Sequence, residues 1–585
     1  MLLSTHTLSA LFVTLVLTAT AGAIPTSLRT RSSTSSPSLV DGSPVVDLGE
    51  YGKWKGVVQN NGTVYSWKAI PYAAPPVGDL RFKAPRPLAK QDSMTQDVSA
   101  DFDGKPTACV QFGTISFVGV NASPGQEDCL KLWVWAPAGA KAGDKLPVQV
   151  YSHGGGMQNS QSPNNDFSDW VGQDKGFIAV NANYRLGALG FFNSEGSQYE
   201  DEPANVGILD SRSATDWVKA NIAHFGGDPN NIAISGQSGG GGAIMTQLVL
   251  YDGKKPNYQK AIPRSIQNYA AYPVKELTVR NDAFAASLNC TSSASSKEGA
   301  VEQLACLRKV DAEAIRLAAL DFSRTKQEDG VNSWPGWLPS IDGKTLTDQP
   351  IRLLESGKIA AVPVISAHVT NEIVRLNPHP NSNFTALVSS TIGADVTPEL
   401  LDKFEAVYPE ASVNASAESG TFPNNDQRAY TFLNEGAANG GAFAVSRAAH
   451  RIGQDSWLIR FNSPEPVPTY PDWYGASHSA DNFYLQNATS TLNETQQAVA
   501  YEWRAYISSF LKHSNPNIDR LATAPEWRTA STDFRYLPRL VISQQLASTA
   551  NETLPTASGM ELLLPAEWDR LKWWMSEEVI GPSRQ

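Results

Sequence analysis

The sequence predicts an α/β fold in which a central, mostly parallel β-sheet is flanked by helices. Two observations carry this prediction: short β-branched runs alternate with helical segments, and glycine-rich turns stand where strands end. The composition, with 41% hydrophobic and 18% charged residues, is that of a globular protein. No linker or internal repeat follows Pro44, so we expect residues 44–585 to form a single domain with large insertions.

The predicted elements alternate along the central part of the chain. Buried strands are predicted at 146–153 and 176–184, where β-branched residues are punctuated by Gly and Asn. The segment 205–226 has apolar side chains at helical spacing, which predicts a helix. A further strand at 231–235 leads through a glycine-rich turn to a second helix at 243–250. One predicted helix, 205–226, separates the strands at 176–184 and 231–235, as in a mostly parallel sheet.

The N-terminal residues have the character of a secretory signal. Leu8 to Thr20 is mostly apolar and too short to span a bilayer, and Ala21 to Ala23 offers the small residues of a cleavage site. We therefore expect residues 1–23 to be a signal peptide. Residues 24–43 are rich in Ser, Thr and Pro and are expected to be a flexible leader before the domain.

Charge and glycosylation motifs favour a soluble, secreted protein. The formal net charge is -11 and no Lys/Arg block interrupts the acidic balance, so no nucleic-acid partner is expected. No later stretch has the roughly 18 apolar residues that a membrane span needs. Candidate N-glycosylation sites of the form N-x-S/T stand at Asn61, Asn121, Asn289, Asn383, Asn414, Asn487, Asn493 and Asn551.

The cysteines Cys109, Cys129, Cys290 and Cys306 fall into two close pairs. In an exported chain this favours disulfides, and sequential pairing is the simplest of the three connectivities. A metal site is the alternative, but neither C-x-x-C spacing nor a neighbouring His supports it. We expect no metal site.

The stretch "ISGQSGGGG" at 234–242 places Ser238 in a G-x-S-x-G pattern between a predicted strand and a predicted helix. A sharp turn there would strain the serine backbone and hold its hydroxyl out, so Gly236 and Gly240 must lack side chains. A flexible linker and a phosphate-binding loop are the alternatives. The phosphate alternative is weak, because no G-K-[ST] follows the glycines.

A second glycine-rich motif, "HGGGM", covers His153 to Met157 directly after the 146–153 strand. Its glycines allow backbone N–H groups to approach a substrate carbonyl, and the N–H of Gly239 would complete an oxyanion hole. An ordinary turn would explain either motif alone. Their order and spacing together favour a nucleophilic serine.

Several longer motifs match those of a known protein family. They are "AIPYAAPPVGDLRFKAP" (69–85), "EDCLKLWVWAP" (127–137), "NYRLGALGFF" (183–192), "NVGILDSRSATDWV" (205–218), "FGGDPNNIAISGQSGG" (225–240), "VPVISAHVTNEI" (362–373) and "GASHSADNFY" (475–484). With them the chain resembles the type-B carboxylesterase/lipase family, which includes cholinesterases and secreted fungal esterases. The resemblance implies an α/β-hydrolase fold, disulfides Cys109–Cys129 and Cys290–Cys306, an ion pair between Arg81 and Glu127, and a Glu as the acid of the triad.

The base and the acid are expected in order after Ser238, each on a loop that follows a strand. The histidines available are His368, His379, His450, His478 and His513. Only His478 lies in a Gly-flanked turn after a strong strand candidate, 456–461, whereas His450 and His513 fall in helix-like segments and His368 is expected to be a local loop residue. Glu372 follows the strand-like "AVPVIS" and matches the acid position of the family.

These residues predict ester hydrolysis through an acyl-enzyme. His478 would activate Ser238, Glu372 would fix the imidazole tautomer, and the N–H groups of Gly155, Gly156 and Gly239 would stabilise the oxyanion. No cofactor is required, the expected partner is a small-molecule ester, and no sequence feature specifies an oligomeric state. A non-catalytic binding protein on this fold is the competing class.

Departures from the family narrow the expected substrate. Gln237 stands where cholinesterases commonly have Glu, and residues 110–128 contain no Trp, so a cationic choline ester would lose its recognition. The same loop is a long lid in fungal lipases of the family and is short here, which favours short-chain esters and little interfacial activation. A long-chain triglyceride lipase remains the alternative.

Other motifs bear on the surroundings of the site. Ser479 stands after His478 where the family often has Gly, and "IQNYAAY" at 266–272 replaces a common Ser-Gly-Ser turn. The Trp-rich segment 565–575 places Trp568, Leu571 and Met575 at helical spacing, which favours a helix docked on its own core over a membrane or partner surface.

Overall fold

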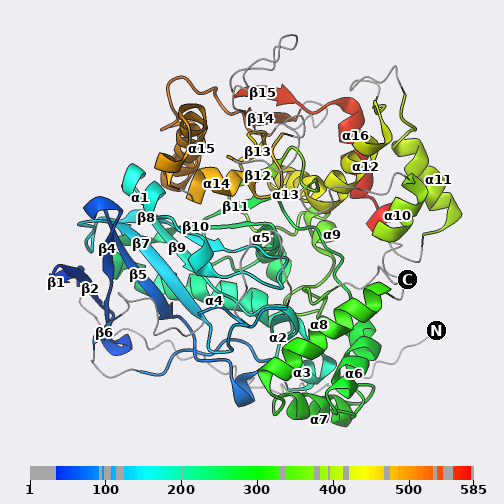
Figure 1. The fold of residues 1–585 in the computed structure, drawn as a ribbon, viewed down its shortest axis with the longest axis horizontal. Coiled ribbons are helices and arrows are strands. Elements are labelled where there is room, and N and C mark those ends of the chain that lie inside the picture. Colours follow the sequence, from blue (N-terminus) through cyan, green and yellow to red (C-terminus); the bar gives the residue numbers. More distant parts are fainter. Residues whose placement is uncertain are drawn as a thin grey trace, which may run out of the picture. The chain divides into compact units, whose positions relative to one another are not determined.

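The computed structural model describes the chain from Ser35 onward (Figure 1). The described residues are 35–90, 95–97, 107–112, 124–200, 202–328, 336–374, 383–392, 396–412, 420–466, 475–486, 488–530, 537–543 and 558–580, with only the backbone of 95–97, 323–328 and 580. The predicted signal peptide, the first part of the predicted leader, His379 and the sequons at Asn121, Asn414, Asn487 and Asn551 lie outside the described residues. Residues 35–585 group as one compact unit.

An 11-stranded sheet forms the centre of the fold. From one edge to the other its strands are β15 (Gly559–Leu562), β14 (Pro538–Ile542), β13 (Ser456–Phe461), β12 (Val364–Val369), β11 (Lys260–Arg264), β10 (Gly227–Gln237), β8 (Leu146–Ser152), β9 (Ile178–Ala182), β7 (Lys131–Pro137), β5 (Val64–Pro71) and β4 (Val57–Gln59). All pairs from β14 to β9 are parallel, and the antiparallel pairs lie at the two edges. The prediction of a mostly parallel sheet is confirmed.

Helices cover both faces of this sheet and form groups beyond it (Figure 1). They are α1 (Ser168–Asp174), α2 (Gly187–Phe191), α3 (Glu195–Tyr199), α4 (Val206–Asn221), α5 (Gly239–Val249), α6 (Thr278–Ser287), α7 (Lys297–Leu307), α8 (Ala312–Glu328), α9 (Pro350–Glu355), α10 (Phe384–Ile392), α11 (Pro398–Val407), α12 (Asn425–Asn434), α13 (Gly440–Arg451), α14 (Ala480–Gln486), α15 (Glu494–His513), α16 (Pro565–Trp574) and α17 (Glu577–Ile580).

Successive residues of the central strands enter two separate cores. In β10, Ile232 and Ile234 pack in the core that includes α4, α5 and α13, whereas Ala233 packs in the core that includes α1, α14 and α15. Side chains of a strand point to opposite faces in alternation, so a strand covered on both faces must be apolar throughout. Burial on both faces holds the strands in position, and the loops that follow their carboxyl ends are positioned with them.

The structure extends the strand predicted at 231–235 to Gly227–Gln237, and it differs from the sequence prediction at two further boundaries. A strand, β1 (Ser38–Val40), lies inside the predicted leader 24–43 and pairs with β2 (Ser43–Asp47) in a 4-stranded sheet with β3 (Lys53–Lys55) and β6 (Thr95–Asp97). The ordered domain therefore begins before residue 44. The other difference is the start of α5 at Gly239 instead of 243, which concerns the site described below.

Covalent and ionic links fasten the loops around the sheet. Disulfides join Cys109 to Cys129 and Cys290 to Cys306. Arg81 pairs with Glu127 through two hydrogen bonds of 2.6 Å, as the resemblance implied.

The predicted docking of the C-terminal Trp-rich helix is confirmed. Leu571 and Met575 are buried in the core, and Trp568 packs edge-on against Phe443. Arg570 of the same helix donates to both carboxylate oxygens of Glu435, at 2.8 and 3.0 Å. Glu435 opens a π-helical turn, Glu435–Asn439, between α12 and α13.

Candidate active site

Ser238 stands at the junction between β10 and α5 with φ 60° and ψ −124°. A positive φ is strained for a residue with a side chain, so the surrounding structure must hold it. The Ser238 N–H donates to the carbonyl of Arg264 at 3.0 Å, and its carbonyl accepts from Gly242 and Gln267. The turn therefore holds the Ser238 backbone on both sides and projects its side chain from the end of the strand.

The glycines around Ser238 permit very close packing of backbone on backbone. A Cβ on Gly236 would lie 2.4 Å from the Gly240 carbonyl oxygen, and one on Gly241 would lie 2.4 Å from that of Arg264. Glycine disfavours helix by about 1 kcal/mol, which is why the helix was predicted to begin after it. Close packing of the helix backbone on its neighbours requires glycine here and outweighs this low propensity. The glycines themselves therefore form the first turn of α5.

The predicted serine, histidine and glutamate lie together in one hydrogen-bonded series. Nε2 of His478 is 2.7 Å from Oγ of Ser238, and Nδ1 of His478 is 2.6 Å from Oε2 of Glu372. The side chain of Glu372 is 1% exposed and that of His478 is 13% exposed. Because a carboxylate only accepts, Nδ1 carries a proton, and in the neutral imidazole Nε2 is then the nitrogen with a lone pair facing the serine hydroxyl.

Neighbouring backbone and one distant side chain hold the Glu372 loop. Oε1 of Glu372 accepts from the Val369 N–H at 2.9 Å. Asn434, the last residue of α12, accepts from the Ile373 N–H at 3.0 Å and donates to Oδ1 of Asn371 at 3.2 Å. Asn434 could not be predicted as a support of this loop, because no local sequence pattern connects α12 to it.

Two of the glycines predicted for the oxyanion hole, Gly156 and Gly239, lie against each other next to Ser238. Gly155 and Gly156 have φ of 99° and 64°, a conformation that suits residues without a side chain. A Cβ on Gly239 would lie 2.8 Å from the Gly156 nitrogen, so the two glycines are adjacent. Within the described part of the chain, the N–H groups of Gly155, Gly156 and Gly239 have no protein acceptor.

Two further histidines are buried and neutral. Burial lowers the pKa of His153 to about 4, and its ring stacks on Tyr184 with centroids 4.6 Å apart. His368 is not the loop residue that was predicted, because it lies within β12 and its Nε2 is 3.2 Å from Nη1 of Arg539. Burial, with a contribution from Arg539, lowers its pKa to about 3. His450 and His513 lie in helices α13 and α15, as predicted.

Ser479, the departure from the family next to His478, has a φ of 73°. This is a left-handed conformation, which glycine adopts without strain. Ser479 therefore carries a backbone strain that a glycine at this position would avoid.

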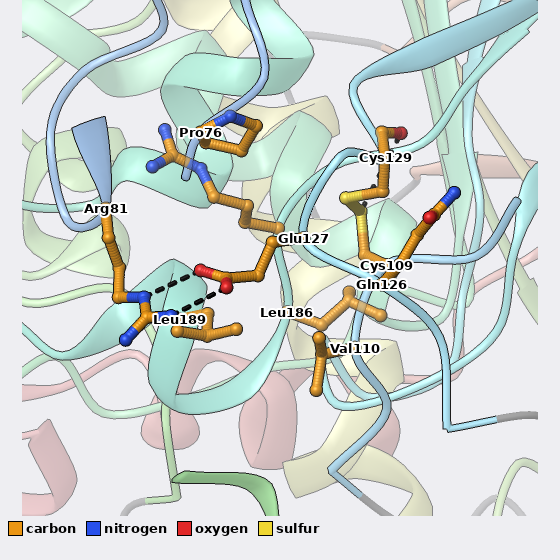
Figure 2. Close-up of a pocket in the computed structure, with 10 residues that line it drawn as sticks. Pro76, Arg81, Cys109, Val110, Gln126, Glu127, Cys129, Leu186 and Leu189 are labelled. Carbon is orange, nitrogen blue, oxygen red and sulfur yellow. Dashed lines mark hydrogen bonds and ion pairs between the residues drawn. A yellow bond between two sulfur atoms is a disulfide. The ribbon is translucent and has the colours of Figure 1, made fainter. Parts of the chain in front are cut away.

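A pocket elsewhere in the structure lies beside the Arg81–Glu127 pair and the Cys109–Cys129 disulfide (Figure 2). None of its lining residues belongs to the Ser238 series. Arg81 also donates from Nη1 to the carbonyls of Leu307 and Val310, so its donors are used within the protein. The pocket is a gap beside a structural ion pair rather than a part of the candidate active site.

The described residues contain no group of His, Cys, Asp and Glu side chains arranged to hold a metal ion. Nor does any helix in the same part of the chain combine the length and the apolar character needed to cross a membrane.

A family model, related sequences and solved structures each match this chain over most of its length. The model of the carboxylesterase family matches residues 42–554. The secreted triacylglycerol lipase LIP1 of Gibberella zeae is 28% identical over 515 residues, which cover 81% of this chain and 83% of the relative. Lipase 1 of Geotrichum candidum is 30% identical over 517 residues, covering 78% and 85% respectively. The crystal structure of Aspergillus niger EstA superposes with a TM-score of 0.74 at 25% identity, over 92% of this chain and 99% of that chain.

Proposed function

The chain belongs to the carboxylesterase family and is a carboxylic ester hydrolase, and we propose that it acts as a secreted serine esterase on small, short-chain esters. In this proposal Ser238 is the nucleophile, His478 the general base and Glu372 the acid of the triad. The hydrogen-bonded series of these residues carries the proposal, because it gives the serine a base and gives the base a carboxylate.

Hydrolysis in this proposal proceeds in two stages. His478 takes the Ser238 proton through Nε2 while Oγ attacks the ester carbonyl, and the N–H groups of Gly155, Gly156 and Gly239 bind the oxyanion. The alcohol leaves with the proton from His478, and an acyl-enzyme remains. Water then attacks the acyl group by the same route, and Ser238 recovers its proton.

Two features support small and neutral substrates. The cysteines that bound the loop after Cys109 are separated by only 20 residues, whereas the corresponding loop forms a long lid in fungal lipases of the family. Gln237 places a neutral amide beside Ser238, so a cationic choline group would find no carboxylate there.

The alternative is a lipase that acts on long-chain triglycerides with the same triad. The name of the Gibberella zeae relative, a secreted triacylglycerol lipase, favours it. That name also supports secretion of this chain, as does the predicted signal peptide. The sequon residues that the structure describes, Asn61, Asn289, Asn383 and Asn493, are all exposed, as glycosylation requires.

The test is hydrolysis of p-nitrophenyl acetate, butyrate and palmitate by the wild type and by Ser238→Ala. We expect the short esters to have the higher kcat/KM and the variant to lose about 10^4-fold or more. Ser235→Ala is the matched control, because Ser235 is a buried serine on the same strand whose Oγ has no hydrogen-bond partner among the described residues. Preference for palmitate or emulsified triglyceride would replace the esterase by the lipase, and an active Ser238→Ala would overturn the triad.

A further inference from the structure

A buried series of polar side chains leads from an ion pair to the ring of His478. Arg264, the last residue of β11, pairs with Asp481 and donates from Nη2 to Oδ1 of Asn482 at 2.9 Å. Asn482 donates from Nδ2 to Oε1 of Gln237 at 3.2 Å. Gln237 then places its Nε2 3.3 Å from Nε2 of His478.

The guanidinium of Arg264 fixes the direction of this series. Arginine has donors only, so the atom of Asn482 that faces it must be the acceptor Oδ1. The amide nitrogen of Asn482 then faces Gln237 and donates to it, so Gln237 must accept through its side-chain oxygen Oε1. The N–H groups of Gln237 are consequently directed at His478, and a flip of either amide would set like atoms against each other.

We propose that Gln237 is a positioning residue that keeps the imidazole of His478 neutral, with its lone pair at Nε2. This inference rests on the proposed function. The Gln237 N–H shares the one lone pair of Nε2 with the Ser238 hydroxyl. The hydroxyl can turn to accept from an imidazolium, but the Gln237 N–H only donates, so it favours the unprotonated nitrogen and opposes the imidazolium. Asn482 acts through Gln237 by holding it in the required orientation, and Arg264 acts through Asn482.

The charged groups around His478 do not disfavour its protonation. Glu372 accepts at Nδ1 and favours the imidazolium. Glu465 accepts from Oγ of Ser477, the residue before His478, and its negative charge also favours the imidazolium. Asp481 is neutralised by its pair with Arg264. Among these groups, Gln237 is the member that opposes protonation at Nε2.

The experiment follows the acid limb of the kcat/KM profile against pH in Gln237→Met, Gln237→Glu, Asn482→Ala and the double variant Gln237→Met/Asn482→Ala. The substrate is p-nitrophenyl butyrate, monitored where the phenol and the phenolate absorb equally. We expect Gln237→Glu to move the acid limb to higher pH by about 1 unit or more, because a carboxylate there stabilises the imidazolium. Gln237→Met and Asn482→Ala should move it in the same direction by less.

The double variant tests the order of the series. If Asn482 acts only through Gln237, Gln237→Met/Asn482→Ala should have the acid limb of Gln237→Met alone, a non-additive result. Gln497→Glu, at the start of α15, adds the same charge outside the series and should leave the profile unchanged.

Two outcomes would count against these ideas and can be told apart. An unchanged acid limb in Gln237→Met, with only kcat or thermal stability lowered, would show that Gln237 merely fills space and would overturn the inference. Hydrolysis that survives in Ser238→Ala would instead remove the triad on which the inference rests. Because Gln237→Met leaves the Arg264 contacts intact, it decides the question even if Asn482→Ala fails to fold.

Discussion

A Cβ atom on Gly240 would lie 2.0 Å from the carbonyl oxygen of Ser152, so the first turn of α5 packs directly on the backbone at the end of β8. Gly240→Ala should push the helix from the sheet and displace Ser238. We expect the free energy of unfolding to fall by about 1–3 kcal/mol or more and kcat to fall with it. Denaturant unfolding and active-site-titrated kcat measure the two effects.

Gly453→Ala provides the comparison for that change. Gly453 has a φ of 79° with open space around its Cα, so a methyl group there adds backbone strain of about 1–2 kcal/mol and no clash. Its kcat should stay at the wild-type value. Equal losses of kcat in the two variants would show that the contact with Ser152 does not position the serine.

Glu372→Gln should preserve the packing of the loop but remove the carboxylate from Nδ1 of His478. An amide N–H there favours the wrong imidazole tautomer, so kcat should fall by about 10^3–10^4-fold while the folded structure persists. Glu465→Gln is the control, because Glu465 is also buried but accepts from Ser477 rather than from His478. A loss in Glu465→Gln as large as that in Glu372→Gln would argue against the assignment of the acid.

Arg81→Ala should destabilise the protein without touching the triad. The change removes the arginine from the Glu127 carboxylate and from the carbonyl of Val310, while the Leu307 carbonyl keeps the Val310 N–H as a donor, and the cost should be about 3–5 kcal/mol. Lys403→Ala breaks a pair with Glu578 in which the two side chains are 52% and 53% exposed, and it should cost far less. Urea unfolding of both variants gives the difference, and equal costs would contradict a structural role for the Arg81 pair.

His368 should make the protein less stable in acid. Burial lowers its pKa from 6.5 to about 3, so between these values the unfolded chain binds a proton that the folded chain does not. The free energy of unfolding should therefore have its full value above about pH 6.5 and should fall by about 1.4 kcal/mol per pH unit below it. His368→Gln should remove that part of the slope between pH 6 and 4 in urea unfolding, and parallel curves would contradict the prediction.

Sequence patterns predicted the parallel sheet and the segments that bear Ser238, Glu372 and His478, because each is marked locally. A strand, a glycine-rich turn and a helix follow one another at Ser238, and Glu372 and His478 each follow an apolar run. Local rules also produced the errors. Glycine propensity placed the start of α5 too late, since the need for close backbone contact overrides propensity, and a Ser-rich stretch concealed β1.

The supports of the site could not be predicted in this way. Asn434 contacts the Glu372 loop from helix α12. The series of Arg264, Asn482 and Gln237 joins side chains from three separate segments of the chain. Asn, Arg and Gln are common on protein surfaces, so their types give no signal until the fold places them. Their roles depend on tertiary distance alone.

The clamp of Asn434 on the Glu372 loop bears on the biogenesis of the protein. Asn434 is followed by Glu435, whose buried carboxylate is neutralised by Arg570, a residue that the ribosome adds long after the triad residues. A chain truncated before α16 would keep the Tyr408 hydroxyl bond to Glu435 but would lose the arginine that pairs with it. The residue next to the Asn434 clamp is thus tied to a helix whose arginine is synthesised 135 residues later.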